Sequence, residues 1–415
     1  MTTSSGELDG RAAWTVAVAA VTILSIAYGA PLIAVLAMKP IAAELHTQRS
    51  GAAAVGAFVY VGASIGGILA GWLAGRLGVR RIVMFGAAMM AAGLVLSASG
   101  GLLELYAGHG ILMGLFGSAC MFSPLLTYVS RWFERRRGSA VALISSGQAV
   151  AGAIWPPFLQ FGIDESGWRH TMMLFGLFLV VAVVALALIF LRPPPEAPAP
   201  ALPATPGVQR RADVLGLPPN LAMALFMVAI FCCCVPMAMP MQHVVAYCGD
   251  LGLASQYGAA MLSVLLGSAF LARQFWGWLC DRIGGLQTLV LSSMAQITAM
   301  TGFLLTEDST ALFFISSAFG FGMAGLVPAY VIVVREYYSL DEANWRIPAV
   351  LFGGTMGMAA GGWGAGLLFD QFSSYLPAFG TGVAFNVLNF IILMFLFTRS
   401  HGRHTRLMRQ PQTST

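Results

Sequence analysis

Arg273 is the residue of this chain whose side chain is best suited to bind a ligand. It lies within the apolar stretch 255–279, and no other charged residue lies well inside such a stretch. A charge at bilayer depth costs roughly 2.5–3.5 kcal/mol on insertion scales, so an arginine there indicates a function. Because the planar guanidinium matches a carboxylate, we interpret Arg273 as an anion-binding residue. The alternative is an arginine that reaches the membrane surface or pairs structurally.

His243 is the second candidate for chemistry, and we interpret it as the only histidine inside a predicted membrane span. It lies near one end of the stretch 219–247. Histidine titrates near neutral pH, so His243 could carry a proton or donate a hydrogen bond to a ligand. A hydrogen-bonded packing role for the ring is an equally open interpretation.

Motifs of common soluble enzymes are missing from the sequence. No nucleotide-binding loop, zinc-ligand spacing or nucleophile elbow occurs. Three of the 6 cysteines, Cys232, Cys233 and Cys234, are consecutive within one apolar stretch, where free cysteine behaves as a small hydrophobic residue. We therefore expect no cofactor, no metal site and no enzymatic activity.

The composition predicts a helical integral membrane protein. Hydrophobic residues make up 58% of the chain and charged residues 9%, whereas a soluble domain carries about 25% charged residues. A membrane-spanning helix needs about 20 mainly apolar residues. Twelve such stretches are expected, at residues 12–37, 51–75, 80–99, 104–129, 138–163, 169–191, 219–247, 255–279, 286–306, 309–334, 346–369 and 375–398.

The basic residues predict which side of the membrane each loop faces. With twelve spans and both termini on one side, only Lys39, Arg49 and Arg169 of the 22 basic residues fall on the other side, apart from the intramembrane Arg273. By the positive-inside rule the arginine-rich side is the cytoplasm. We therefore expect both termini there, in an inner or plasma membrane. The net charge of +5 reflects this topology and contact with lipid, and we expect no nucleic acid partner.

Two short stretches of the chain are near copies of each other. Residues 71–78, GWLAGRLG, reappear as residues 277–284, GWLCDRIG. The positions that we single out in the copies are Gly71, Arg76, Gly78, Gly277, Asp281, Arg282 and Gly284. A repeat at half the chain length predicts two related bundles. A Pro- and Ala-rich linker at 192–218 divides the bundle at 1–191 from the bundle at 219–398, which precedes a tail at 399–415.

The repeated stretch resembles the signature loop of the major facilitator superfamily, found after the second helix and echoed after the eighth. That loop reads Gly-x-x-x-Asp-Arg-x-Gly. The second copy matches it with Asp281 and Arg282, whereas the first copy has Gly75 in place of the aspartate, with Glu134 in a neighbouring loop as a substitute acid. The resemblance implies an all-α fold of twelve transmembrane helices in two pseudo-symmetric six-helix bundles. It also implies that these loops form gate contacts.

Further residues resemble the monocarboxylate transporter branch of this superfamily and its oxalate:formate antiporter relatives. The run from Arg273 to Gly277 is similar to the eighth helix of that branch, whose arginine holds the substrate carboxylate. Residues 131–140, 145–147 and 242–252 are similar to other parts of it. By this analogy the substrate-binding candidates are Arg273, His243, Gln242, Tyr28, Tyr60, Tyr128, Gln148 and Trp155.

The chain departs from that branch at three places. Leu32 stands where animal members have lysine, and Ala269 stands where they have aspartate, so their proton-handling scheme does not transfer. The second cation of the oxalate antiporter has no counterpart within 347–369, which favours a monoanion over a dianion.

The resemblance therefore implies a small organic anion as substrate, with protons as a candidate coupling ion and a monomer in the lipid bilayer. Transport is expected to proceed by alternating access, in which the two bundles rock about a midplane site. Two alternatives stay open. One is an exporter of drugs or other non-carboxylate solutes on the same fold, and the other is a membrane sensor that transports nothing.

Overall fold

The computed structural model describes residues 8–133, 136, 140, 143–193 and 213–408. Before the linker the helices are α1 (Arg11–Leu36), α2 (Met38–Glu44), α3 (Arg49–Leu77), α4 (Val79–Ser99), α5 (Leu102–Tyr106), the π-helix η1 (Ala107–Phe116), the 3₁₀-helix η2 (Gly117–Cys120), α6 (Phe122–Ser130) and α8 (Gly147–Phe190). After it follow α9 (Pro219–Asp250), α10 (Ser255–Ile283), α11 (Gly285–Leu305), α12 (Ser309–Met323), α13 (Leu326–Tyr337), α14 (Leu340–Phe372) and α15 (Leu376–Met408).

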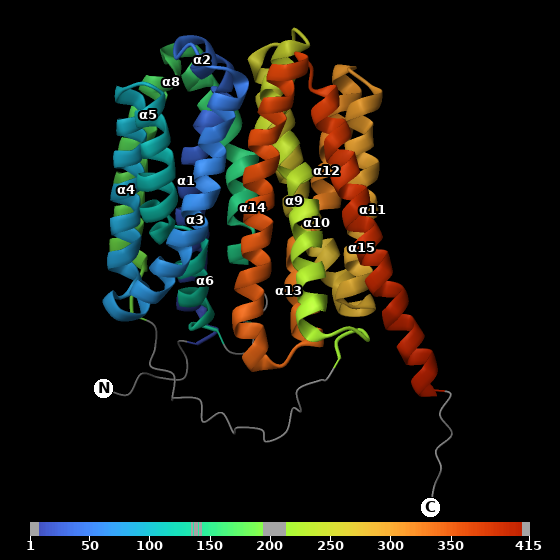
Figure 1. Ribbon diagram of the computed structural model, residues 1–415. Coiled ribbons are helices and arrows are strands. Elements are labelled where there is room, and N and C mark those ends of the chain that lie inside the picture. The colour runs from blue at the N-terminus through green and yellow to red at the C-terminus, as the bar shows by residue number, and fades with distance from the viewer. Residues whose placement is uncertain (1–7, 134–135, 137–139, 141–142, 194–212, 409–415) are drawn as a thin grey trace, which may run out of the picture.

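The helices form two groups that lie side by side, α1 to α8 in blue and green and α9 to α15 in yellow to red (Figure 1). Within each group the helices pack mainly on one another, for example α1 on α8 and α9 on α14. The groups meet mainly where α3 packs on α14 and α8 packs on α10, and α1 also contacts α9. The predicted two-bundle architecture is thus confirmed, while the domain boundaries at 191 and 219 stay a prediction.

The expected twelve spans agree broadly with the helices. Within the described residues, 10 helical stretches are long and apolar enough to cross a membrane. One of them, Leu143–Phe190, contains two expected spans, because Gly167 at φ 80° breaks α8 into two arms. The 33-residue α14 covers the expected span 346–369 and is also long enough to cross. The last helix continues to Met408, into the segment expected to be a tail.

The two copies of the repeated stretch end their helices in the same way. Gly78 follows α3 with φ 83°, and Gly284 follows α10 with φ 88°. Glycine adopts this left-handed region without the steric penalty that a Cβ atom causes. In each copy the N–H of that glycine bonds the carbonyl oxygen four residues back, of Ala74 or Cys280. The repeat is therefore a pair of equivalent helix ends.

The loops define two faces of the molecule. We call the face that holds the turns at Gly78 and Gly284 the basic face, because most arginines outside the helices lie there. The opposite face holds α2, the break at Gly167 and the turn at Gly252 (Figure 1).

Candidate functional site

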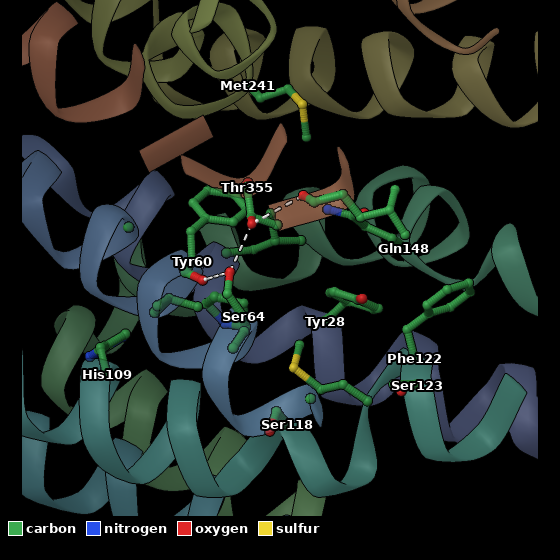
Figure 2. Close-up of a pocket in the computed structure, with 18 of the residues that line it drawn as sticks. Tyr28, Tyr60, Ser64, His109, Ser118, Phe122, Ser123, Gln148, Met241 and Thr355 are labelled. Atoms are coloured by element: carbon green, nitrogen blue, oxygen red, sulfur yellow. Dashed lines mark hydrogen bonds between the residues drawn. The ribbon is translucent and has the colours of Figure 1, made fainter. Parts of the chain in front are cut away.

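A cavity of about 720 Å³ lies between the two groups of helices. Its lining comes from both groups and includes Tyr28 of α1, Tyr60 of α3, Gln148 of α8 and Gln242 of α9. Four of the eight predicted substrate-binding residues therefore share one cavity, and Figure 2 shows three of them around it. Most of the remaining lining is apolar.

One hydrogen bond crosses the cavity between the groups. The Ser64 hydroxyl of α3 lies 2.8 Å from the Thr355 hydroxyl of α14 and donates to it (Figure 2). Neither residue was predicted from sequence. Single hydroxyl residues are frequent in membrane helices, so only their position at the α3–α14 contact distinguishes this pair.

Arg273 lies beside this cavity and is partly buried. It stands on α10 almost three helical turns, or about 15 Å, before the helix ends at Ile283. Its Nη1 donates to the carbonyl oxygen of Ser145, just before α8, and it interacts electrostatically with Tyr28. The Nε atom is buried and meets no hydrogen-bond partner in the described structure. An unpaired buried donor on a charged group is a binding position for an anion.

Tyr128 and Trp155 do not line the cavity, in contrast to the expectation. The Tyr128 hydroxyl donates to the carbonyl oxygen of Arg192 at 2.6 Å. The Trp155 indole donates to the carbonyl oxygen of Ser25 at 2.8 Å, and its ring packs on Phe175. Both side chains thus have their polar atoms satisfied within the first group of helices.

At the opposite face, five residues form a cluster that we call the latch: Lys39, Arg49, Asp250, Asp370 and Tyr375. Arg49 of α3 bonds both carboxylate oxygens of Asp250, at 2.8 and 3.0 Å, and Lys39 adds a contact at 2.9 Å. The Asp370 carboxylate accepts the backbone N–H groups of Arg49 and Ser50, each at 2.8 Å. The latch therefore joins the ends of α9 and α14 to the start of α3 in the other group.

His243 belongs to the latch side of α9 and does not line the cavity. Its Nδ1 lies 3.0 Å from the Tyr375 hydroxyl, and its Nε2 lies 2.7 Å from the Gly362 carbonyl oxygen. Because a carbonyl can only accept, Nε2 carries the proton and Nδ1 accepts from Tyr375. Tyr375 in turn accepts from Arg49 at 2.9 Å. The histidine thus continues the latch into α14.

The interpretation of His243 as the only histidine within a span is wrong. His109 lies in the expected span 104–129, and the structure places it in the π-helical segment η1. Its side chain is fully buried, with Nδ1 2.8 Å from the Ser97 hydroxyl. Its Nε2 has no partner among the described residues, and His109 belongs to the cavity lining. The apolar residues on both sides of His109 in the sequence are enough to predict that it lies within a membrane span.

The gate residues lie at the basic face. Arg76 stacks on Trp72 at 3.9 Å, and Arg282 stacks on Trp278 at 4.2 Å, so the two copies share a cation–π contact. Asp281 is exposed and makes no hydrogen bond or ion pair with the described residues. Glu134 lies outside the described residues.

The polar contacts between the groups lie at the opposite face and at mid-depth. Besides the latch, the Ser255 hydroxyl of α10 donates to Asp164 of α8 at 2.8 Å. Toward the basic face the cavity lining includes Ile68 and Trp72, whose side chains are 66% and 57% exposed. The described conformation is therefore closed at the opposite face and open at the basic face.

Comparison with known families gives one match that covers most of the chain. The profile of the Major Facilitator Superfamily matches residues 16–339.

Several curated proteins similar to this chain are named as monocarboxylate transporters, and others are named as MFS-type transporters. Monocarboxylate transporter 11 of Homo sapiens is 32% identical over 281 residues, which are 67% of this chain and 58% of that protein. Monocarboxylate transporter 13 of Bos taurus is 28% identical over 323 residues, 75% of this chain and 72% of that protein. The chain thus spans about three-fifths of the length of the first relatives that it matches.

Solved structures similar to this chain are also transporters. A mutant of the nucleoside transporter NupG gives a TM-score of 0.75 at 14% identity, over 93% of this chain and 100% of that chain. An inward-facing, occupied bacterial homologue of the human lysosomal transporter Spinster gives 0.70 at 14% identity, over 93% and 96%. At this identity the likeness shows the fold alone.

Proposed function

Because the chain belongs to the Major Facilitator Superfamily and resembles its monocarboxylate transporter branch, we propose that it transports a small organic monoanion by alternating access. The observation that carries the proposal is the Arg273 guanidinium, whose buried Nε is unpaired and whose charge interacts with the cavity residue Tyr28. A carboxylate at this place would meet the free Nε, while Nη1 stays bonded to Ser145. The names of the relatives support a monocarboxylate.

Around Arg273, the substrate would be enclosed by the cavity residues Tyr28, Tyr60 and Gln148. No lysine or arginine lines this cavity within the part of the chain that the structure describes, and Arg273 acts on it from beside the lining residue Tyr28. A single charge balances one carboxylate, so a second carboxylate would enter a low-dielectric cavity without a partner. A monoanion is therefore the better fit.

In the proposed cycle the latch closes the opposite face in one conformation, and the repeated motifs close the basic face in the other. The basic face is the cytoplasmic side by the positive-inside rule, so the described conformation is inward-open. Release of the latch would let α3 and α14 separate at the opposite face, while Asp281 would gain a partner at the basic face. Such rocking of two bundles around a fixed site needs no bound nucleotide.

The proposal is tested by uptake into vesicles that contain the purified full-length protein. Arg273→Lys keeps the charge and loses the two-point fork, so we expect uptake of labelled monocarboxylates to fall at least tenfold. Arg399→Lys, at an exposed position toward the end of α15 and outside the gate motifs, is the matched control and should change uptake far less. Uptake by Arg273→Ala that stays near normal, per amount of folded protein, would refute the anchoring role.

A drug or other non-carboxylate exporter is the second candidate, because the cavity lining is mainly apolar. The same vesicles separate the candidates. An exporter would move lipophilic cations or neutral dyes, and Arg273→Lys would leave that flux unchanged. Imposed pH gradients distinguish proton symport from exchange and from facilitated flow.

A further inference from the structure

We infer that Gln242 is a specificity-determining residue, which binds an uncharged oxygen acceptor on the part of the substrate remote from its carboxylate. The inference rests on the proposed anion transport and adds a second recognition point to it. The favoured substrates are then elongated monocarboxylates with a distal ketone, ester or amide oxygen, instead of plain aliphatic acids.

The first observation is a buried, unpaired donor on a residue of the cavity lining. Gln242 is only 4% exposed and lines the cavity, yet its Nε2 has no hydrogen-bond partner in the described structure. Water cannot reach a buried amide freely, so an unpaired N–H there costs free energy until an acceptor arrives. An oxygen on a bound substrate would supply that acceptor.

The second observation is that the amide is held in place by both groups of helices. A methyl group added at Gly56 of α3 or at Gly362 of α14 would overlap the Gln242 amide. The neighbouring His243 bonds the carbonyl oxygen of Gly362 at 2.7 Å, which fixes α14 against α9 at this level. A fixed donor discriminates between ligands better than a mobile one, because it cannot turn to find another acceptor.

The distance between Gln242 and Arg273 sets the length of the substrate. At about 1.5 Å per residue, Gln242 lies about 12 Å from the end of α9 at Asp250, and Arg273 lies about 27 Å from the start of α10 at Ser255. These two ends are joined by a short turn, so the two residues differ by about 15 Å in depth. Their side chains bridge part of that difference, and a spacer of several carbon atoms bridges the rest.

The test compares matched acids by thermal stabilisation of the detergent-purified full-length protein. Levulinate, which has a ketone, is compared with valerate, which has the same number of carbon atoms and no ketone. In the same way 7-oxooctanoate is compared with octanoate. We expect at least one ketone acid to bind roughly tenfold more tightly than its plain partner, which is in the range for pairing a buried donor. Gln242→Leu should abolish the preference, so that each ketone acid binds about as tightly as its plain partner.

Gln296→Leu is the matched control, because Gln296 is a fully buried glutamine of α11 outside the cavity lining. It should retain the ketone preference. If each ketone acid binds the wild-type protein no more tightly than its plain partner, the role of Gln242 is overturned and the proposal of anion transport stands. If none of the four acids stabilises the protein and Arg273→Ala leaves uptake into vesicles unchanged, both proposals are refuted.

Discussion

His243 connects two parts of the molecule through its two ring nitrogens. Nδ1 accepts from Tyr375 in the latch, and Nε2 donates to Gly362 behind the cavity wall. A second proton on the ring would take away the acceptor that Tyr375 uses and add a positive charge beside Arg49, with Asp370 as the nearest compensating acid. Protonation would therefore loosen the latch.

For this reason we expect His243→Gln to flatten the dependence of transport rate on pH, because glutamine does not titrate. Exchange at neutral pH should be partly retained. Initial uptake rates over a pH series, for both proteins in the same vesicles, measure the effect. An unchanged pH profile in the variant would assign proton coupling to the substrate itself, carried as the neutral acid.

Glu44 offers a pH test outside the membrane spans. The hydrogen bond from Arg169, at 2.6 Å, lowers the pKa of the Glu44 carboxyl below its ordinary value, and Trp168 adds a second bond at 2.6 Å. A lowered pKa in the folded state stabilises the fold above the unfolded-state pKa, about 4.3, and this stabilisation is lost as the pH falls through the lower value.

Glu44→Gln should thus lower the melting temperature slightly at neutral pH, and the difference from wild type should shrink as the pH falls below about 4.3 and vanish once the pH is below the lowered pKa. The effect is small because the Glu44 side chain is 47% exposed. Thermal unfolding from acid to neutral pH measures it. A difference that persists in acid would point to lost packing instead of the carboxylate.

The sequence predicts some of these residues much better than others. Arg273 is recognisable because one charge stands in an apolar run, and that signal needs no tertiary structure. Gln242 is different, because its Nε2 is unpaired in a place that Gly56 and Gly362 of other helices surround, and that arrangement is tertiary. Tyr28 lines the cavity and Trp155 does not, because their side chains point in different directions. The spacing of residues along the sequence does not predict those directions.

Among the elements, the start of α3 is stabilised by an acid from the other group. Asp370 of α14 accepts the N–H groups of Arg49 and Ser50, which have no partner within their own helix. Asp308 makes the same kind of contact at the start of α12, with Ala311 at 2.8 Å, but within one group. The two acids differ in whether their contact crosses the interface between the groups.

Asp370→Ala should therefore shift the molecule toward the conformation open at the opposite face, whereas Asp308→Ala should only lower stability, by about 1 kcal/mol. Labelling of a cysteine introduced near the latch by a membrane-impermeant thiol reagent reports the shift. Equal labelling of both variants would mean that Asp370 is a helix cap without a role in gating.

The helix end at Gly75 offers a test of the departure from the family motif. A Cβ atom added at Gly75 would meet no atom within 4 Å, so a larger side chain fits in this conformation. Gly75→Asp restores the acid that the second copy has at Asp281, and we expect it to favour closure at the basic face. Gly75→Asn, of equal size without charge, is the control. Cysteine accessibility from the basic side should fall for the aspartate alone.

The spans could be predicted closely, because long apolar runs bounded by glycine or charge are local signals. The break in α8 at Gly167 and the turns at Gly78 and Gly284 follow the same logic. The π-helical segment η1 could not be predicted, since it depends on how η1 packs against α3 and α4. Composition does not encode that packing.

At the scale of the whole molecule, the contacts between the two groups are unequal. The opposite face has a charged latch and the Ser255–Asp164 hydrogen bond, and the cavity is open toward the basic face. If transport needs both faces to open in turn, then a permanent link across the opposite face should stop it. A carrier that leaks through a fixed pore would not be affected.

We therefore expect the double variant Asp164→Cys/Ser255→Cys, cross-linked by a short bifunctional thiol reagent with a reducible bridge, to lose nearly all transport. The two side chains belong to α8 and α10 and lie 2.8 Å apart at their oxygen atoms, so a short bridge spans them. Reduction of the bridge should restore uptake, and each single variant treated in the same way should keep it. The described native cysteines are all buried, which limits side reactions. Full transport by completely cross-linked protein would exclude rocking of the two groups as the mechanism.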